Sequence, residues 1–197
     1  MSHDDRTIAV YDAKAADYAD HFASAGPHPH LQAFLAALPS SSRVLDVGCG
    51  PGQASAFLRT AGHRPDPVDA SPAMVTLAND RHAIGARLAS FDDLDALARY
   101  DGVWANFSLL HAPRADLPRY IAAIHKALKP QGIFHLALKT GTGEGRDRLD
   151  RHYTFVTRHE ITDLLASAGF SLLATHEGEE RGLAGTLDPF IVLLARA

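Results

Sequence analysis

The sequence predicts an α/β fold: one Rossmann-like domain with a mostly parallel sheet and helices on both faces. Three observations support this prediction. Short β-type segments alternate with amphipathic segments, and glycine or proline separates them every ~15 to 30 residues. A glycine-rich turn also follows a buried apolar segment near Gly48. Such alternation is typical of strand–helix–strand units, and 197 residues predict one domain over 1–197.

The first half of the chain predicts three strands and four helices. Apolar residues recur at helical spacing over 6–22, 30–38 and 51–61, where Gly62 can end the third helix. Ser71 can cap a fourth helix that has Pro72 at its first position. Strands are predicted over 43–47, 63–69 and, more weakly, 86–88.

In the second half, strands over 100–105 and 133–138 flank a helix that begins near Asp116 and ends at Pro130. Thr157 and Glu160 form a capping box for the next helix, which Gly169 ends. The last strands, over 170–175 and 190–194, are separated by a loop that cannot easily hold a crossover helix. We therefore expect the sheet to end in an antiparallel strand.

Two prolines constrain the strand over 63–69. Pro65 and Pro67 have no N–H group to give to a neighbour, and both point to the same side because they are two residues apart. The strand over 43–47 should be the central neighbour, so the prolines should face the sheet edge. We expect the edge strand over 86–88 to be very short.

Composition and charge restrict the functional class. The chain carries a formal charge of −4, with 46% hydrophobic and 21% charged residues, which disfavours nucleic acid and anionic membranes as partners. Cys49 is the single cysteine, so no internal disulfide or cysteine-based metal site is expected. No HExxH spacing occurs, and no metal site is predicted. The polar N-terminus and the lack of a long apolar segment predict a cytoplasmic protein.

The segment 46–52, DVGCGPG, carries the clearest chemical signal. Glycines after a buried strand allow the backbone to approach a ligand, and the following helix presents free N–H groups. Gln53 stands where a dinucleotide fingerprint needs glycine, and no Gly-Lys-Ser/Thr phosphate loop exists. Asp69, which ends the next strand 23 residues after Asp46, has the place and spacing of an acid that binds a ribose diol.

These residues resemble motif I of the class I S-adenosylmethionine-dependent methyltransferases. The resemblance extends over most of the chain: DASPAM at 69–74, FDDL at 91–94, YDGVWAN at 100–106 with LLH at 109–111, and LKPQG at 128–132. It implies a seven-stranded sheet in the order 3-2-1-4-5-7-6, with strand 7 antiparallel. It also implies that residues 1–40 form helices that cover the cofactor site.

The resemblance names S-adenosyl-L-methionine as the cofactor and assigns its contacts. Asp46 would face the ammonium group, the backbone at Gly48 and Gly50 would approach the ligand, and Asp69 would accept both ribose hydroxyls. Met74 would pack on the adenine. The remaining expected contacts are Tyr11 and Tyr18 over the cofactor, Cys49 and Ala70 in the loops, Ser90 and Phe91 at the adenine edge, and Asn106 near the methionine part.

We predict methyl transfer to a small-molecule acceptor by in-line displacement, with the reactants positioned in a closed, dry pocket. His111 is the candidate base. The polar segment 140–153 is interpreted as an active-site cover, whose Arg146, Arg148, Arg151 and Tyr153 would meet an acidic acceptor. NFSL at 106–109 replaces the Asn/Asp-Pro-Pro-aromatic motif of DNA-adenine and glutamine methyltransferases, which disfavours those targets.

Two other functions stay open at this point. One is a nicotinamide-dependent oxidoreductase, although Gln53 and the final antiparallel strands argue against it. The other is a non-catalytic S-adenosylmethionine-binding protein. The sequence does not identify the acceptor, the acceptor atom, the need for a base or the oligomeric state.

Overall fold

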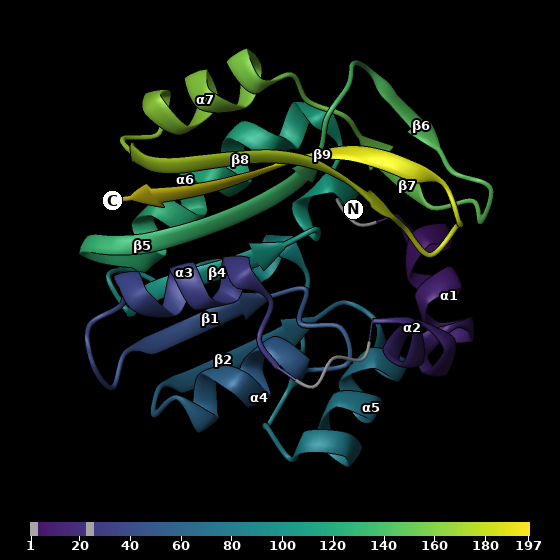
Figure 1. Cartoon of the computed structure of the whole chain (residues 1–197), viewed down its shortest axis with the longest axis horizontal. Helices are drawn as coiled ribbons and strands as arrows, with labels where there is room; N and C mark the ends of the chain where they lie inside the picture. Colours follow the sequence, from purple (N-terminus) through teal and green to yellow (C-terminus); the bar gives the residue numbers. More distant parts are fainter. Residues whose placement is uncertain (1–3, 23–25) are drawn as a thin grey trace.

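A computed structural model describes residues 4–22 and 26–197 and confirms the predicted fold class (Figure 1). Seven strands form one sheet in the order β3-β2-β1-β4-β5-β9-β8. Strands β1 to β5 are mutually parallel, and β9 runs antiparallel to both β5 and β8. The sheet contains β1 (Arg43–Val47), β2 (Arg64–Asp69), β3 (Arg87–Leu88), β4 (Tyr100–Asn106), β5 (Leu128–Lys139), β8 (Ser171–Arg181) and β9 (Leu187–Arg196).

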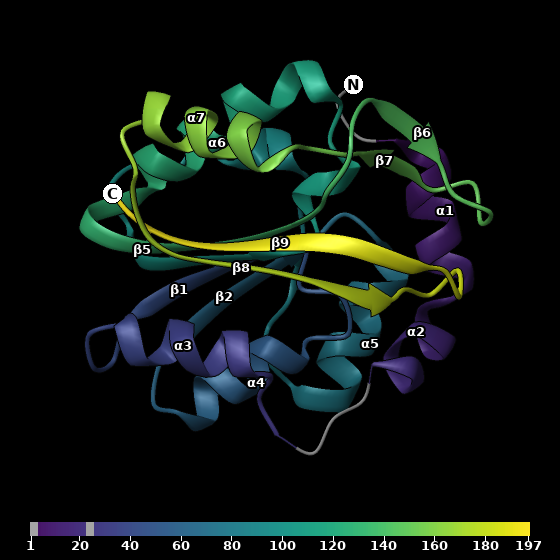
Figure 2. The same ribbon diagram turned by 45° about the horizontal axis from the view of Figure 1, so that its top comes forward.

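Helices cover both faces of the sheet. Figure 2 shows α6 and α7 on one face and α3, α4 and α5 on the other. The helices are α1 (Asp5–Ala13), α2 (Ala15–His21), α3 (Pro29–Ala37), α4 (Gln53–Thr60), α5 (Pro72–His82), α6 (Leu117–Ala127) and α7 (Arg158–Ser167). Among the described residues, no helix has the length and apolar character needed to cross a membrane.

The N-terminal segment differs from the single helix predicted over 6–22. Its described part forms α1 and α2, which are separated at Lys14, whose φ of −119° leaves the helical region. The Asp12 carboxylate accepts hydrogen bonds from the Ser71 hydroxyl and the Ala73 amide, 2.6 and 3.1 Å away. These bonds fasten the end of α1 to the start of α5, a contact that helical periodicity does not reveal.

The prediction for the two prolines of β2 is confirmed. The Arg64 amide donates to Ser42 and the Val68 carbonyl accepts from Gly48, so the even-numbered residues face the β1 side. The Asp69 carbonyl accepts from Ala89, so the odd-numbered residues, including both prolines, face β3. The edge strand β3 has only two residues.

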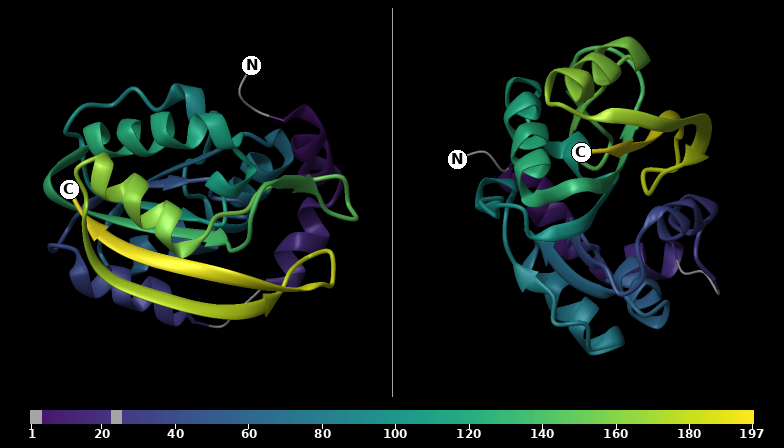
Figure 3. Two further views of the ribbon diagram at one scale, coloured as in Figure 1. Left: turned by 90° about the horizontal axis from the view of Figure 1, so that it is seen from above. Right: turned by 90° about the vertical axis from the view of Figure 1, so that its left-hand side faces the viewer.

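The C-terminal half contains more strand than predicted. Within the segment 140–153 and just after it, β6 (Glu144–Arg146) pairs antiparallel with β7 (His152–Thr154). Strands β8 and β9 extend to a turn near residue 184, well beyond the predicted strand ends. Figure 3 shows this long hairpin at the border of the sheet, with its turn near the N-terminal helices.

Candidate active site

Two adjoining cavities lie at the carboxyl ends of β1, β2 and β4. Cavity 1 extends toward Asp69, Met74 and Phe91, whereas cavity 2 extends toward Lys139 and Phe190. They share six lining residues, namely Tyr11, Tyr18, Gly48, Gly50, Asn106 and Phe107. One elongated ligand can therefore enter both, as expected for ligands at the carboxyl edge of a parallel sheet.

The glycine turn brings its backbone close to both cavities. Gly48, Gly50 and Gly52 have φ values of +73°, +52° and +83°, which other residues adopt at a cost. A Cβ built on Gly48 would lie 2.4 Å from the Cβ of Ser108. Glycine at position 48 thus lets the turn after β1 pack directly on the turn after β4.

The Asp69 carboxylate is held in a fixed orientation. The Gly50 amide donates to its Oδ2 at 2.8 Å, and the Ser71 amide donates to its Oδ1 at 2.9 Å. Burial raises the pKa of Asp69, although these backbone hydrogen bonds oppose the shift. Each carboxylate oxygen keeps a second lone pair. Because Asp69 lines cavity 1, its carboxylate can accept hydrogen bonds from both hydroxyls of a diol bound there.

Asp46 lies deeper than Asp69 and lines cavity 2. Its side chain is 1% exposed and accepts a 2.7 Å hydrogen bond from the Ser55 hydroxyl. Burial, together with the charge of Asp69, raises the pKa of Asp46 to about 7. An ammonium group in cavity 2 would favour the ionised form of this acid.

The far end of cavity 1 suits a flat, largely apolar group. Met74, Ala70, Ala89, Ser90 and Phe91 line it. The Ser90 hydroxyl donates to Asp93 at 2.9 Å and caps the short 3-10 helix Phe91–Asp93. Cys49 instead lines cavity 2; it is buried, and burial raises the pKa of its thiol, so it is a poor nucleophile.

Ser108 is a lining residue that sequence reasoning did not single out. Its hydroxyl is buried and has no hydrogen-bond partner among the described residues, and it lines cavity 1. A buried hydroxyl without a partner costs free energy, and a polar ligand in cavity 1 can supply one. The donor set of cavity 1 therefore fits an adenosine-type ligand.

The candidate base His111 lines cavity 1, and both of its ring nitrogens have hydrogen-bond partners within the protein. Its Nδ1 lies 2.6 Å from the His152 carbonyl oxygen and must donate to it, which leaves Nε2 as an acceptor. The Tyr11 hydroxyl lies 2.8 Å from Nε2 and accepts a 3.0 Å hydrogen bond from Arg151. Burial lowers the pKa of His111 to about 3, so the ring is neutral at neutral pH.

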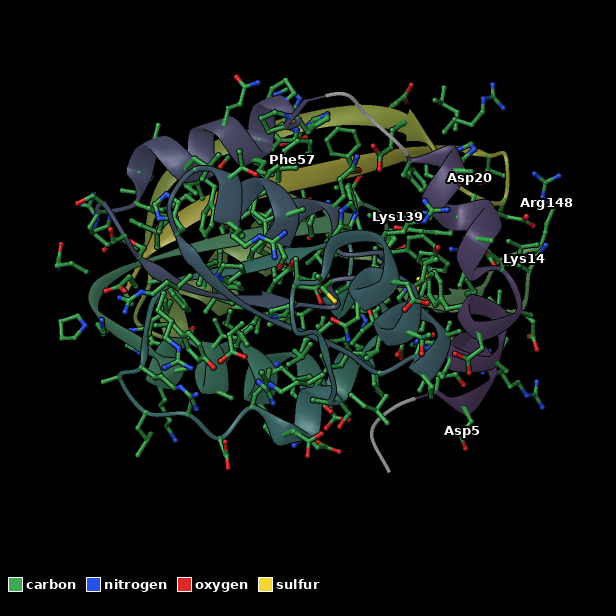
Figure 4. All side chains as sticks on the ribbon, turned by 90° about the horizontal axis from the view of Figure 1, so that it is seen from below. Asp5, Lys14, Asp20, Phe57, Lys139 and Arg148 are labelled. Atoms are coloured by element: carbon green, nitrogen blue, oxygen red, sulfur yellow. The ribbon has the colours of Figure 1, made fainter. Side chains whose placement is uncertain are left out.

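The four residues expected to bind the acceptor separate into two groups. Arg151 and Tyr153 line cavity 2, and Arg151 is 2% exposed and bonded to Asp147 at 2.6 Å. Arg146 instead pairs with Asp4, and Arg148 donates to the Ala184 carbonyl. Figure 4 shows Arg148 at the outer margin of the molecule.

Aromatic side chains form much of the wall of cavity 2. They come from α4, β4, the turn after β4 and β9, and they are Phe57, Trp104, Phe107 and Phe190. Figure 4 labels Phe57 and also Lys139, the last residue of β5. Glu180 lines this cavity from β8. The sequence offered no signal for Phe190 and Glu180, because their placement depends on the full length of the β8–β9 hairpin.

Asn106 ends β4 between the two cavities, and a neighbour constrains its side chain. The Nε2 atom of His135 lies 3.0 Å from the Asn106 Oδ1. The His135 ring stacks on Trp104 with ring centroids 3.6 Å apart, and the residue is 1% exposed. With Oδ1 bonded to His135, the amide nitrogen of Asn106 is the group left for a ligand.

The sheet order and the cofactor-type cavity define a class I, Rossmann-like S-adenosylmethionine fold. The sequence profile described as "Methyltransferase domain" matches residues 19–175. This chain belongs to that methyltransferase family, and S-adenosylmethionine is its cofactor.

Individual relatives agree with this assignment. The chain is 30% identical over 140 residues to a malonyl-[acyl-carrier protein] O-methyltransferase of Pectobacterium atrosepticum, covering 69% of this chain and 54% of that protein. It is also 35% identical over 111 residues to an S-adenosyl-L-methionine-dependent Diels-Alderase of Talaromyces variabilis, covering 51% and 37%. The chain thus spans about half or less of the length of these two curated relatives.

A solved structure is similar over nearly the whole chain. The 1,6-didemethyltoxoflavin-N1-methyltransferase of Burkholderia thailandensis, with S-adenosylhomocysteine bound, superposes with a TM-score of 0.69 and 27% identity. The match covers 95% of this chain and 87% of that one.

Proposed function

We propose that this chain transfers the methyl group of S-adenosylmethionine to a small-molecule acceptor held in cavity 2. The observation that carries the proposal is the junction of the two cavities at Tyr11, Gly48 and Asn106, with the anchored Asp69 on one side and aromatic walls on the other. When bound, the cofactor supplies an electrophilic methyl group. The chain then has to hold the two reactants in line and exclude water.

The walls of cavity 2 favour a planar acceptor. Phe57, Trp104 and Phe107 line it with aromatic rings, and Phe107 meets Phe190 edge to face with centroids 5.7 Å apart. The likeness to the enzyme that methylates 1,6-didemethyltoxoflavin supports this acceptor class. The malonyl-[acyl-carrier protein] O-methyltransferases support oxygen as an alternative acceptor atom.

Tyr11 and His111 form the proposed proton acceptor. An acceptor O–H or N–H would give its proton to the Tyr11 oxygen while the Tyr11 proton passes to Nε2 of His111. The Nδ1–H of His111 stays on the His152 carbonyl, so the ring carries the positive charge after the transfer, while Tyr11 stays neutral and its oxygen is held in place by the Arg151 hydrogen bond. His111 would thus act as a base through Tyr11 rather than directly on the acceptor.

Helix α1 and the β6–β7 hairpin form the proposed cover of the site. Arg146 makes two hydrogen bonds to Asp4, at 2.7 and 3.0 Å, and the His152 amide donates to the Thr7 hydroxyl at 2.8 Å. With the Tyr11–Arg151 bond, these contacts join two segments that are about 140 residues apart. Entry of the cofactor would require these contacts between α1 and the β6–β7 hairpin to open.

A second candidate function has an observation in its favour. The Diels-Alderase relative is named as S-adenosyl-L-methionine-dependent, but the reaction in its name is not methyl transfer. A chain that binds the cofactor without turnover is therefore the alternative to methyl transfer. A cytoplasmic location and the absence of a nucleic-acid partner stay predictions from the sequence.

Two measurements test the proposal. Calorimetry should give tight binding of S-adenosylmethionine and none of NAD. Incubation with planar N–H and O–H acceptors should yield S-adenosylhomocysteine in proportion to methylated product. Tight binding without turnover across such a panel would favour the alternative.

A further inference from the structure

A third cavity, lined by histidines, opens beside the acceptor cavity. It is an open surface cavity of about 410 Å³ between the start of α3, β5, β8 and β9, and two of its histidines, His28 and His176, are exposed. Its lining residues are His28, Pro29, His30, Ala33, His135, Ala174, Thr175, His176, Val192 and Leu194. His28 and His30 also line cavity 2, so the two spaces adjoin. We call this space the histidine cavity.

The imidazoles in the histidine cavity lie close together. The ring centroid of His30 is 4.7 Å from that of His28, 4.9 Å from that of His176 and 6.5 Å from that of His135. Within the part of the chain that the structure describes, no Asp or Glu lines this cavity. Four basic side chains therefore share a space to which no acid contributes.

The lowered pKa values of these histidines explain why the cluster favours a negatively charged ligand. Burial lowers the pKa of His30 to about 4, and the charges of His28 and His176 add to the shift. Burial and His176 lower the pKa of His28, and burial with His30 and His28 lowers that of His135. Within the histidine cavity, the titratable groups that face His30 are His28 from the start of α3, His135 from β5 and His176 from β8. On its other side His30 borders cavity 2, whose charged lining residues are Asp46, Lys139, Arg151 and Glu180. A negative charge among the histidines would oppose this repulsion.

We propose that the histidine cavity binds an anionic group, a carboxylate or a phosphate, carried by the acceptor whose methylated end lies in cavity 2. This inference rests on the proposed function. When neutral, His28, His30 and His176 each keep one N–H donor for an anion, whereas the single N–H of His135 is donated to Asn106. An anion nearby also raises the pKa of His28 and His30, so the cluster donates hydrogen bonds and then gains charge. A carboxylate or phosphate group has a volume a few times the ~30 Å³ of one water, so the cavity is large enough to hold it.

A transition metal is the other ligand that imidazoles bind. Among residues 4–22 and 26–197, no group of three metal-binding side chains is arranged to hold an ion. The anion is therefore the ligand that this arrangement favours.

The link between His135 and Asn106 connects the histidine cavity to the methyl-transfer site. An anion bound at the cluster raises the pKa of His135 and keeps its Nε2 as a donor to Asn106. Acceptors with a correctly spaced acidic group would then be held in place at both ends.

Histidine NMR on the full chain without cofactor tests this inference. Inorganic phosphate and acetate are titrated separately at pH 6.0 and 7.5 against chloride at equal ionic strength. We expect the ring signals of His28, His30 and His176 to shift together and saturate, with affinity at least about threefold higher at pH 6.0, because binding takes up a proton. Saturation by phosphate alone would indicate a phosphate-bearing acceptor, saturation by acetate alone would indicate a carboxylate-bearing acceptor, and saturation by both would support a site for either anion.

Matched variants complete the test. His30→Gln and His176→Gln should each weaken phosphate or acetate binding at least about tenfold. His159→Gln, whose side chain is 87% exposed on α7, should leave it unchanged. Equal, unsaturated shifts of all histidines would overturn the inference, as would stoichiometric Zn²⁺ binding by these rings with no response to either anion. Since these measurements need no turnover, a failure of methyl transfer would leave their outcome readable.

Discussion

The Tyr11 hydroxyl lies 2.8 Å from Nε2 of His111, although 100 residues separate the two in the chain. Arg151 donates to the same hydroxyl, so the Tyr11 proton points to His111. In the proposed mechanism, this hydrogen bond makes Tyr11, rather than His111, the group next to the acceptor.

Removing the Tyr11 hydroxyl should impair turnover more than cofactor binding. Tyr11→Phe should lower kcat about 100-fold or more, the usual contribution of a positioned proton acceptor, and change the Kd for S-adenosylmethionine only slightly. Tyr18→Phe is the matched control, because it removes a neighbouring hydroxyl from the same cavities. A kcat that falls equally in both variants would contradict the relay.

Asp69 should control cofactor affinity. Asp69→Ala removes an acceptor worth about 1.5–3 kcal/mol for each charge-assisted hydrogen bond, so S-adenosylmethionine should bind at least about tenfold more weakly by calorimetry. The melting temperature of the free protein should change little, because burial already disfavours this charge. An unchanged Kd would exclude the ribose assignment.

Asp46 should make stability fall as the pH rises. Its pKa is about 7 in the folded protein and near 3.9 in an unfolded chain, so the folded state holds the proton more tightly between these values. The free energy of unfolding of Asp46→Asn, measured with urea, should therefore increase relative to the native chain between pH 5 and pH 8.

Asp66 provides the control of opposite sign for that measurement. Burial raises the pKa of Asp66, but hydrogen bonds from Arg87, Tyr100 and Arg43 outweigh it and hold the pKa below its usual value. Its contribution to stability is present above the ordinary pKa of aspartate and is lost as the pH falls below it. Asp66→Asn should thus be destabilised by a constant amount between pH 5 and pH 8.

The joint between α1 and the β6–β7 hairpin should loosen when Arg146 is removed. Arg146→Ala breaks the two bonds to Asp4, and hydrogen exchange in residues 5–13 and 144–154 should accelerate. Arg148→Ala, which loses only its bond to the Ala184 carbonyl, is the control. In the native chain, exchange in both segments should slow when cofactor and acceptor are bound. Equal exchange with and without ligands would leave the hairpin without a role as a cover.

Several features of the fold could be read directly from local sequence. Val44 and Val47 belong to a short apolar segment before Gly48, and Pro65 and Pro67 determined which side of β2 faces the sheet edge. Ser71 and the Thr157–Glu160 pair begin their helices as predicted. These signals depend on residues a few positions apart, and their physical causes are steric or involve a single hydrogen bond.

Other features required the chain to be folded. Arg146, expected at the acceptor, is paired with Asp4, and the Tyr11–His111–Arg151 chain joins three segments far apart in sequence. The histidine cavity likewise combines residues of α3, β5 and β8.

The sequence by itself determined the alternation of strands and helices, the glycine turn and the acid that ends β2, because each arises from local spacing. Only the tertiary structure decided which charged and aromatic side chains meet across the cavities. Long polar side chains such as Arg146 choose among several partners, and that choice depends on how closely the hairpins and helices approach one another. No local pattern encodes those distances.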